Sequence, residues 1–221
     1  MEYKYIDEHL IMSFFEALNG SGVKYVLLRN TGGELPAQLR DGKDIDILVC
    51  HEDIDEFMRF MEQENFQKKI HPVGKLAGWK LAYQMHDFLF YKKRKSPYKF
   101  YVDVSQELCC HSVMPNVWIP LDRKIQEDAW QYRRYDHEKG WWCLDERTEL
   151  IMYLVRAVLD KQQFSSGYVE NIKLRCYLLD DVTTRERLKL VFFKYTDRLT
   201  EMLKKEEYDK IITNYYKFKD Y

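Results

Sequence analysis

Cysteine is scarce in this chain, and the cysteines that are present follow no pattern. There are five, at positions 50, 109, 110, 143 and 176, an odd number without a C-x-x-C pair. This excludes the paired framework of a small disulfide-rich domain and argues against a zinc cluster. We therefore expect free thiols in a reducing cytoplasm.

Long apolar runs are also missing. A helix that spans a bilayer needs about 20 consecutive apolar residues, and no run in the sequence approaches that length. The first five residues, Met-Glu-Tyr-Lys-Tyr, lack the basic-then-apolar order of a signal peptide. The expectation is a cytoplasmic protein without a membrane span.

Net charge and several catalytic motifs are absent as well. The 35 basic and 36 acidic residues almost cancel, which argues against a dedicated nucleic-acid enzyme with a broad basic face. The six histidines show no H-x-x-x-H spacing, and no Gly-Lys-Ser/Thr phosphate loop occurs. Zinc catalysis of the H-x-x-x-H type and a Walker-type nucleotide site are therefore not supported.

The first half of the chain alternates between helical and strand patterns. At 221 residues, 46% of them hydrophobic, the chain can form one large domain or two small ones. Apolar spacing predicts helices at 10–18 and 51–64, a short helical turn at 35–39, strands at 23–29 and 44–49, and a hairpin from 81–91 and 98–104. The basic run 92–97 is the exposed turn of this hairpin, with contact to an anionic acceptor as the alternative.

The pattern becomes purely helical after about residue 140. Helices are predicted at 144–159, 168–179 and from 185 to the end, and Asp145 stands where the first of them should begin. We predict an α+β fold: a mixed β-sheet with flanking helices, followed by an all-helical C-terminal domain. The expected division is 1–108 for the catalytic domain, 109–142 for a connecting segment and 143–221 for the helical domain.

Two acids stand inside the second predicted strand, in the run Lys-Asp-Ile-Asp-Ile-Leu-Val that begins at Lys43. Side chains at i and i+2 of a strand project together, so Asp44 and Asp46 share one face while the isoleucines face a core. Adjacent anions repel unless a cation lies between them. A divalent metal is the natural candidate, most of all Mg²⁺, with Mn²⁺ as the second choice. The alternative is a surface strand that merely alternates acids with apolar residues.

A third acid, Asp103, is embedded in Tyr101-Val102-Asp103-Val104. Three acids on neighbouring strands can hold two metal ions about 3.5–4 Å apart, the arrangement that serves in-line displacement at phosphorus. Asp103 could also act as general base. The alternative is a solvated strand residue without a catalytic role.

Together these features resemble the DNA polymerase beta-type nucleotidyltransferase superfamily, over roughly residues 10–107. The resemblance is strongest at residues 25–30 (Tyr-Val-Leu-Leu-Arg-Asn), 43–49 and 101–104. It implies metal-dependent transfer of a nucleoside monophosphate from an NTP to an acceptor, with release of pyrophosphate. It further implies that Asp44 and Asp46 are the paired metal ligands and that Asp103 is the third acid. The chain also resembles bacterial nucleotidyltransferase-like proteins, some of which accompany surface-polysaccharide synthesis. This resemblance is weaker than the one to the superfamily.

The chain departs from this superfamily at the end of its first strand. Members usually carry Gly-Ser or Gly-Gly there to hold the triphosphate, whereas this chain has Arg29 and Asn30. Arg29 can bind phosphate in bidentate fashion, with Asn30 in place of the serine; alternatively Arg29 caps the strand or pairs with Glu34.

Two cations in the helical part could also reach the triphosphate. The resemblance suggests that Arg156 and Lys161 point back toward it. For Arg156, an ion pair with Asp160 or Glu149 is the equally weighted alternative.

The function expected from the sequence is therefore nucleotidyl transfer from an NTP to a hydroxyl or phosphate of a small-molecule or glycan-type acceptor. Two alternatives stay open. One is a nucleotide-binding or regulatory module without turnover, favoured by the missing Gly-Ser. The other is a toxin-like nucleotidyltransferase that modifies tRNA or protein. The base of the NTP, the acceptor and the oligomeric state do not follow from the sequence.

Overall fold

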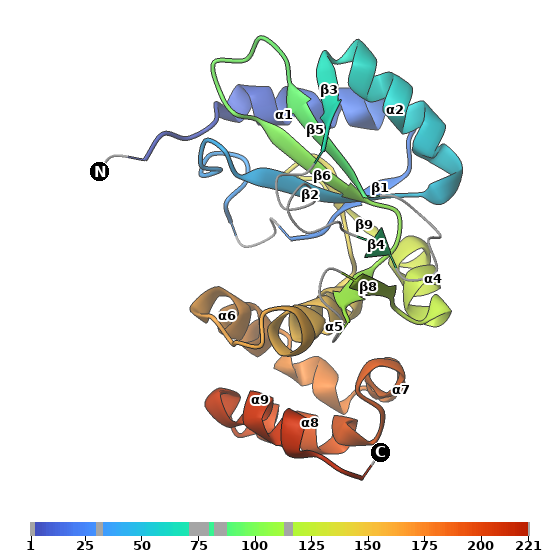
Figure 1. Cartoon of the computed structure of the whole chain (residues 1–221), viewed down its shortest axis with the longest axis vertical. Coiled ribbons are helices and arrows are strands. Elements are labelled where there is room, and N and C mark those ends of the chain that lie inside the picture. The colour runs from blue at the N-terminus through green and yellow to red at the C-terminus, as the bar shows by residue number, and fades with distance from the viewer. Residues whose placement is uncertain (1–2, 30–32, 71–79, 82–87, 113–116, 221) are drawn as a thin grey trace.

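A seven-stranded mixed sheet is the centre of the N-terminal part of the molecule (Figure 1). In this computed structural model, residues 3–29, 33–70, 80–81, 88–112 and 117–220 are described. The sheet has the strand order β3-β5-β6-β2-β1-β10-β9. Its strands are β1 (Tyr25–Leu27), β2 (Asp44–Val49), β3 (Phe66–Lys69), β5 (Leu89–Lys93), β6 (Tyr101–Ser105), β9 (Arg134–Asp136) and β10 (Trp141–Cys143).

Two neighbouring strand pairs in this sheet are parallel, β2 with β6 and β1 with β10, and the other pairs are antiparallel. A second, three-stranded sheet has the order β4-β8-β7. Its strands are β4 (Lys80–Leu81), β7 (Cys109–His111) and β8 (Val117–Pro120).

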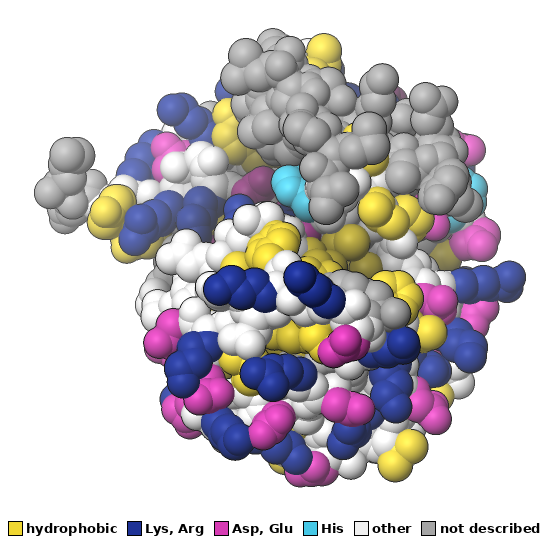
Figure 2. All heavy atoms as spheres, turned by 60° about the horizontal axis from the view of Figure 1, so that its bottom comes forward, with side chains coloured by type: hydrophobic (Ala, Val, Ile, Leu, Met, Phe, Trp, Pro, Cys, Tyr) yellow, Lys and Arg dark blue, Asp and Glu magenta, His cyan; other side chains and the backbone are white. Residues whose placement is uncertain are grey.

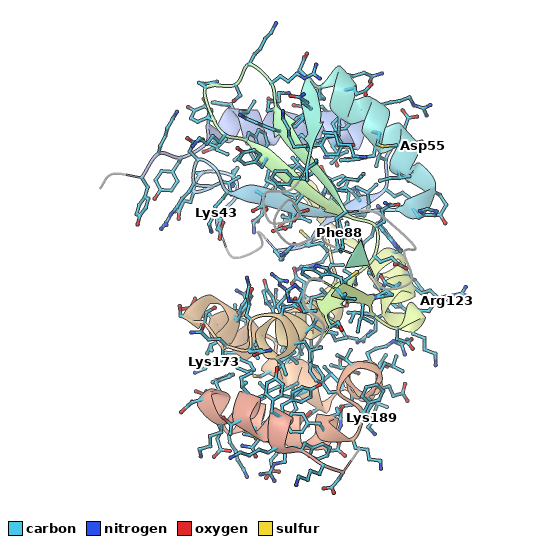
Figure 3. The ribbon with its side chains drawn as sticks, viewed as in Figure 1. Lys43, Asp55, Phe88, Arg123, Lys173 and Lys189 are labelled. Atoms are coloured by element: carbon cyan, nitrogen blue, oxygen red, sulfur yellow. The ribbon has the colours of Figure 1, made fainter. Side chains whose placement is uncertain are left out.

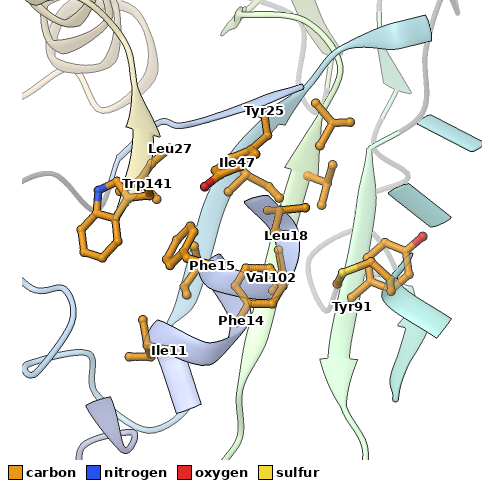
Figure 4. Packing of buried hydrophobic residues seen from close by; sticks show 14 of the residues in the cluster. Ile11, Phe14, Phe15, Leu18, Tyr25, Leu27, Ile47, Tyr91, Val102 and Trp141 are labelled. Atoms are coloured by element: carbon orange, nitrogen blue, oxygen red, sulfur yellow. The ribbon is translucent and has the colours of Figure 1, made fainter. Parts of the chain in front are cut away.

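One face of the large sheet is covered by α1 (Glu8–Gly20) and α2 (Ile54–Gln63), which follows the 3₁₀ turn η1 (His51–Asp53). Asp7 caps α1 by accepting a hydrogen bond from the amide of His9. Phe14 and Phe15 of α1 pack with Ile47 and Val102 of the central strands in a fully apolar core (Figure 4). An isoleucine or a valine stands at every second position of β2 and β6, because every second side chain of a strand enters this core.

The opposite face of the sheet packs on the helical part of the chain (Figure 1). Val26 of β1 and Leu48 of β2 belong to a second apolar cluster together with Leu150 and Leu154. The helices of this layer are α4 (Arg123–Gln131), α5 (Glu146–Val155), α6 (Ser166–Leu174), α7 (Val182–Phe192), α8 (Thr196–Lys204) and α9 (Tyr208–Lys217). Short turns join them: η3 (Arg156–Asp160, π-helical), η4 (Cys176–Asp180) and η5 (Phe193–Tyr195). The acids of β2 are thus on a face that looks toward the helices.

The predicted fold class is confirmed: a mixed sheet with flanking helices precedes a helical region. Asp145 caps α5 as expected, accepting hydrogen bonds from the amides of Arg147 and Thr148. The predicted hairpin is present as β5 and β6, with shorter arms, and its residues 82–87 lie outside the described part of the chain.

Residues 33–37 form a turn that overlaps the short helical turn expected at 35–39, and the amide of Gln38 donates to the carbonyl of Glu34 at 2.7 Å. Two details differ from expectation. β3 escaped prediction because three of its four side chains are exposed and polar, so it lacks apolar alternation. β9 and β10 come from the segment expected to be a connection, yet they complete the large sheet. The division at residues 108 and 142 itself stays a prediction.

No helix among the described residues is both long and apolar enough to cross a membrane. All five cysteines are free.

Candidate active site

The three acids singled out in the sequence meet at one place. β2 and β6 are parallel neighbours, and their register sets Asp46 directly beside Asp103 and Asp44 beside Tyr101. Aligned residues of neighbouring strands project to the same face, and so do residues two apart on one strand. Each acid therefore offers an oxygen that lies within 4.8 Å of an oxygen of each of the other two.

These acids lie on the sheet face that turns toward the helices. The side chains of Asp46 and Asp103 are only 11% and 12% exposed, whereas Asp44 at the start of β2 is half-buried. Ile45 and Ile47 point to the other side and are fully buried in the core beneath α1 and α2. The alternation of β2 thus separates a packing face from a charged face, as the sequence predicted.

Arg29 is the cation nearest to the acids among the described residues. It follows β1, and the amide of the preceding Leu28 donates to the carbonyl of Asp46 at 2.9 Å, which holds this segment against β2. The Arg29 Nη2 lies 2.5 Å from Asp46 Oδ1 and 3.8 Å from Asp103 Oδ2. The predicted alternative of a pair with Glu34 is not what forms, because Glu34 binds Lys43 at 3.1 Å instead.

Burial and mutual repulsion change the acidity of this cluster. Burial raises the pKa of Asp46 to about 7; Arg29 opposes the rise, and Asp44 and Asp103 add to it. Burial likewise raises the pKa of Asp103 to about 6, against the opposing effect of Arg29. Burial alone would lower the pKa of Arg29, but Asp46, Asp103 and Asp44 outweigh it and the pKa is raised. The acids carry more negative charge than Arg29 alone compensates.

The donor set fits a hard divalent cation. Mg²⁺ takes oxygen ligands at 2.0–2.1 Å, so two oxygens on one ion lie about 3 Å apart when adjacent and about 4 Å apart when opposite. Carboxylate oxygens within 4.8 Å of one another approach this spacing. Within the described ranges, this is the one group of three or more His, Cys, Asp or Glu side chains that could hold a metal ion.

The helical layer brings a second arginine toward the acids. Arg156 begins the π-helical turn η3 and is nine-tenths buried. Its positive charge lowers the pKa of both Asp46 and Asp103, which places it within electrostatic reach of them. Its Nη1 binds Asp160 Oδ2 at 2.5 Å, while its Nε has no hydrogen-bond partner. Arg156 therefore forms the ion pair with Asp160, one of the two interpretations from the sequence, and its contact with a triphosphate stays a prediction.

Asp160 holds this arrangement in place. Its carboxylate is 2% exposed, and its second oxygen accepts a hydrogen bond from the amide of His111 in β7 at 2.7 Å. It thus ties η3 to the small sheet and fixes one edge of the Arg156 guanidinium. Glu149, the other partner considered for Arg156, instead binds Arg175.

Lys161 and Asn30 are the other two site residues predicted from the sequence. Lys161 follows η3 and is exposed, and no ion pair joins it to another residue that the structure describes. Asn30 lies outside the described residues. Tyr168 of α6, one of 17 tyrosines, acts electrostatically on Arg29 and packs against Tyr153. Only tertiary structure could single it out, since no local motif marks it.

Comparison with known proteins gives structural neighbours but no sequence family. No protein-family model matches the sequence, and no curated protein matches it. The similar solved structures include ANT(2")-Ia in complex with adenylyl-2"-tobramycin, with 12% identity over 83% of this chain and 95% of that chain and a TM-score of 0.49. They also include the lincosamide antibiotic adenylyltransferase LnuA, lincomycin-bound, with 15% identity over 79% and 98% and a TM-score of 0.42.

A third is an antigenic nucleotidyltransferase-like protein from Paracoccidioides brasiliensis, with 13% identity over 89% of this chain and 91% of that chain and a TM-score of 0.45. These likenesses concern the fold alone.

Proposed function

We propose that the chain is a divalent-metal-dependent nucleotidyltransferase. In the proposed step, an acceptor hydroxyl oxygen bonds to the α-phosphorus of an NTP while the bond from that phosphorus to the oxygen bridging to the β-phosphate breaks. Pyrophosphate leaves, and the hydroxyl proton passes to a carboxylate. The observation that carries the proposal is the register of β2 and β6, which gathers two largely buried acids and the half-buried Asp44, none of them of use to packing.

Each residue of the site has a distinct task in this proposal. Asp44, Asp46 and Asp103 would hold Mg²⁺, or Mn²⁺ as the second choice. A bound ion of this kind supplies neutralisation of phosphate charge and acidification of the attacking hydroxyl. Asp103 takes the proton as general base. Acids are needed rather than amides because only charged oxygens offset the cations.

The arginines would bind the phosphates. Arg156 faces the acids from the helical layer, and its free Nε can donate to an oxygen of the triphosphate. Arg29 can do the same from the sheet side. Asn30 and Lys161 remain proposed secondary contacts, supported by their places after β1 and η3.

A small-molecule or glycan-type acceptor is the proposed co-substrate. The near-zero net charge argues against a nucleic acid, whose binding needs a broad basic face. The face of the helical part seen in Figure 2 mixes basic and acidic side chains. Several exposed lysines of the helical part are paired, among them Lys205 with Glu201 at 2.6 Å and Lys210 with Glu207 at 2.7 Å.

The test is release of pyrophosphate from each of the four NTPs with Mg²⁺ or Mn²⁺, across a panel of acceptors. The panel should contain sugars, alditol phosphates, aminoglycosides, a lincosamide, tRNA and protein. Asp46→Asn should abolish turnover. Asp55→Asn is the matched control, because Asp55 is an exposed acid on α2, in the layer on the far side of the sheet (Figure 3). Turnover retained by Asp46→Asn would refute the assignment.

A nucleotide-binding module without turnover is the second candidate, and one observation favours it: Arg29 lies directly against the acids. The same screen separates the two functions. A binder would retain an NTP on equilibrium dialysis but release no pyrophosphate with any acceptor.

A further inference from the structure

Arg29 lies where a cation is expected between the acids. Its Nη2 is 2.5 Å from an oxygen of Asp46 and 3.8 Å from an oxygen of Asp103. The same carboxylates belong to the group whose oxygens could hold a metal ion. The guanidinium and a divalent cation therefore use the same oxygens.

The two cations compete for these oxygens. A metal at about 2.1 Å from Asp46 Oδ1 would lie at most about 4.6 Å from the Arg29 nitrogen that is 2.5 Å from the same atom. Two positive charges at such a separation repel in a partly buried site. Binding of a metal at Asp46 is thus disfavoured until Arg29 moves away.

Charge balance indicates when this movement becomes favourable. Counting the three acids and Asp160 against Arg29 and Arg156, the site carries four negative and two positive charges. One Mg²⁺ would cancel this excess, and two would make the sum positive with Arg29 still in place. A triphosphate brings about four negative charges, which restores the balance and offers Arg29 new oxygens to bind.

Arg29 is also the partner that is able to move. The acids belong to paired strands, whose hydrogen bonds fix their backbone. Arg29 lies beyond the end of β1, and its side chain is 36% exposed, so it can rotate toward an incoming nucleotide without disturbing the sheet.

We propose that Arg29 is a displaceable counter-ion that closes the metal site until a nucleotide triphosphate draws it away. This rests on the proposed function and adds a form of regulation to it: free metal binds weakly, and metal and nucleotide bind together. Arg29 then stands where Gly-Ser is missing at the end of the first strand, and it pairs with the acids until the triphosphate binds.

The experiment compares the wild-type protein with Arg29→Met, which keeps the length of the side chain but removes its charge. Mn²⁺ affinity is measured without nucleotide by electron paramagnetic resonance. The affinity for the Mn²⁺ complex of α,β-methylene-ATP is measured by calorimetry, with enough Mn²⁺ to saturate the nucleotide. The same measurement is made with the α,β-methylene analogues of GTP, CTP and UTP. Arg29→Met should bind free Mn²⁺ at least tenfold more tightly and the Mn²⁺–nucleotide complex more weakly. Arg29→Lys, which retains a cation, should bind free Mn²⁺ nearly as weakly as the wild-type protein.

Arg40→Met is the matched control. Arg40 is exposed and lies over the ring of Tyr3 at 3.8 Å, so its replacement removes the same charge from another part of the molecule. It should change neither affinity. Circular dichroism establishes that each variant is folded.

The outcomes are distinguishable. If Arg29→Met binds free Mn²⁺ no more tightly than the wild-type protein, while both bind the Mn²⁺–nucleotide complex, the counter-ion proposal is wrong and the proposed function is unaffected. If no protein binds Mn²⁺ in either form, both proposals are overturned. Tighter binding of free Mn²⁺ together with weaker binding of the Mn²⁺–nucleotide complex by Arg29→Met would support the counter-ion proposal.

Discussion

Replacing Asp46 by asparagine should stabilise the metal-free protein, although it removes a buried ion pair with Arg29. Asparagine keeps the shape of aspartate but not its charge. Burial holds the pKa of Asp46 near 7, compared with an ordinary value of 3.8. The charged form therefore costs folding free energy, and the neutral amide avoids that cost.

The magnitude follows from linkage. Each pKa unit corresponds to about 1.4 kcal/mol. Below pH 3.8 the carboxyl group is protonated in both states, and the wild-type protein bears no penalty. As the pH rises, the unfolded chain ionises first, so stability is lost until the folded-state pKa near 7 is passed. The expected advantage of asparagine is close to zero at pH 3, about 1.5 kcal/mol at pH 5 and about 4 kcal/mol at most at pH 7.

The assay is urea unfolding in EDTA at these three pH values, with Asp55→Asn as the control that should show no pH-dependent gain. For a chain of this size, each kcal/mol raises the melting temperature by about 2–4 °C. Adding Mg²⁺ with a non-hydrolysable NTP analogue should reverse the order, because only the wild-type site binds the pair and gains stability by mass action.

A lower stability of Asp46→Asn at pH 7 in EDTA would refute this reasoning. So would a gain that does not vary with pH, since it would show that the charge of Asp46 is not its cause. A ligand-induced stabilisation of equal size in both proteins would contradict the assignment of Asp46 as a metal ligand.

Three further predictions concern the rest of the site and its support. Asp103→Asn should lower the rate of pyrophosphate release by about 10²–10⁴-fold, the usual contribution of a general base, with an unchanged circular dichroism spectrum; a smaller loss would remove Asp103 from that role. Asp160→Asn should loosen Arg156 and raise the KM for the NTP more than it lowers kcat, and a change confined to kcat would argue against a positioning role. Arg175→Met should destabilise the fold by about 3 kcal/mol in urea, because it removes the nearer partner of the buried Glu149 and leaves only Arg134 Nη2, 3.7 Å away. Adding Glu149→Gln should restore most of that loss, and failure to do so would point to lost packing instead.

Much of this site was predictable because its signals are local. Alternation in a strand is a property of consecutive residues, so the sequence alone assigned Asp44 and Asp46 to one face and the isoleucines to the core. The cap at Asp145 and the helical stripes after it are equally local, and they predicted the start of α5 and the helical nature of the C-terminal part. The third acid was identified from the same kind of pattern, an acid inside an apolar run.

The partners of these residues were decided by tertiary structure. The register that sets Asp103 beside Asp46 depends on how two strands far apart in the sequence pair with each other. The choice of Arg29 for the acids rather than for Glu34 depends on which carboxylates lie within its reach after folding. From the sequence Arg156 could be assigned to an ion pair or to the triphosphate, and folding sets Asp160 against one edge of its guanidinium while its Nε has no hydrogen-bond partner.

Consecutive residues were therefore enough to predict three acids in apolar strands, a cation after the first strand, two cations in the helical part, and a sheet joined to helices. Folding settled which charges face one another, and with them the acidity of Asp46 and the contacts of Arg29. This difference comes from the range of the interactions. Secondary-structure periodicity is set by neighbours within a few residues, whereas burial and charge pairing depend on segments that meet only when the chain has folded.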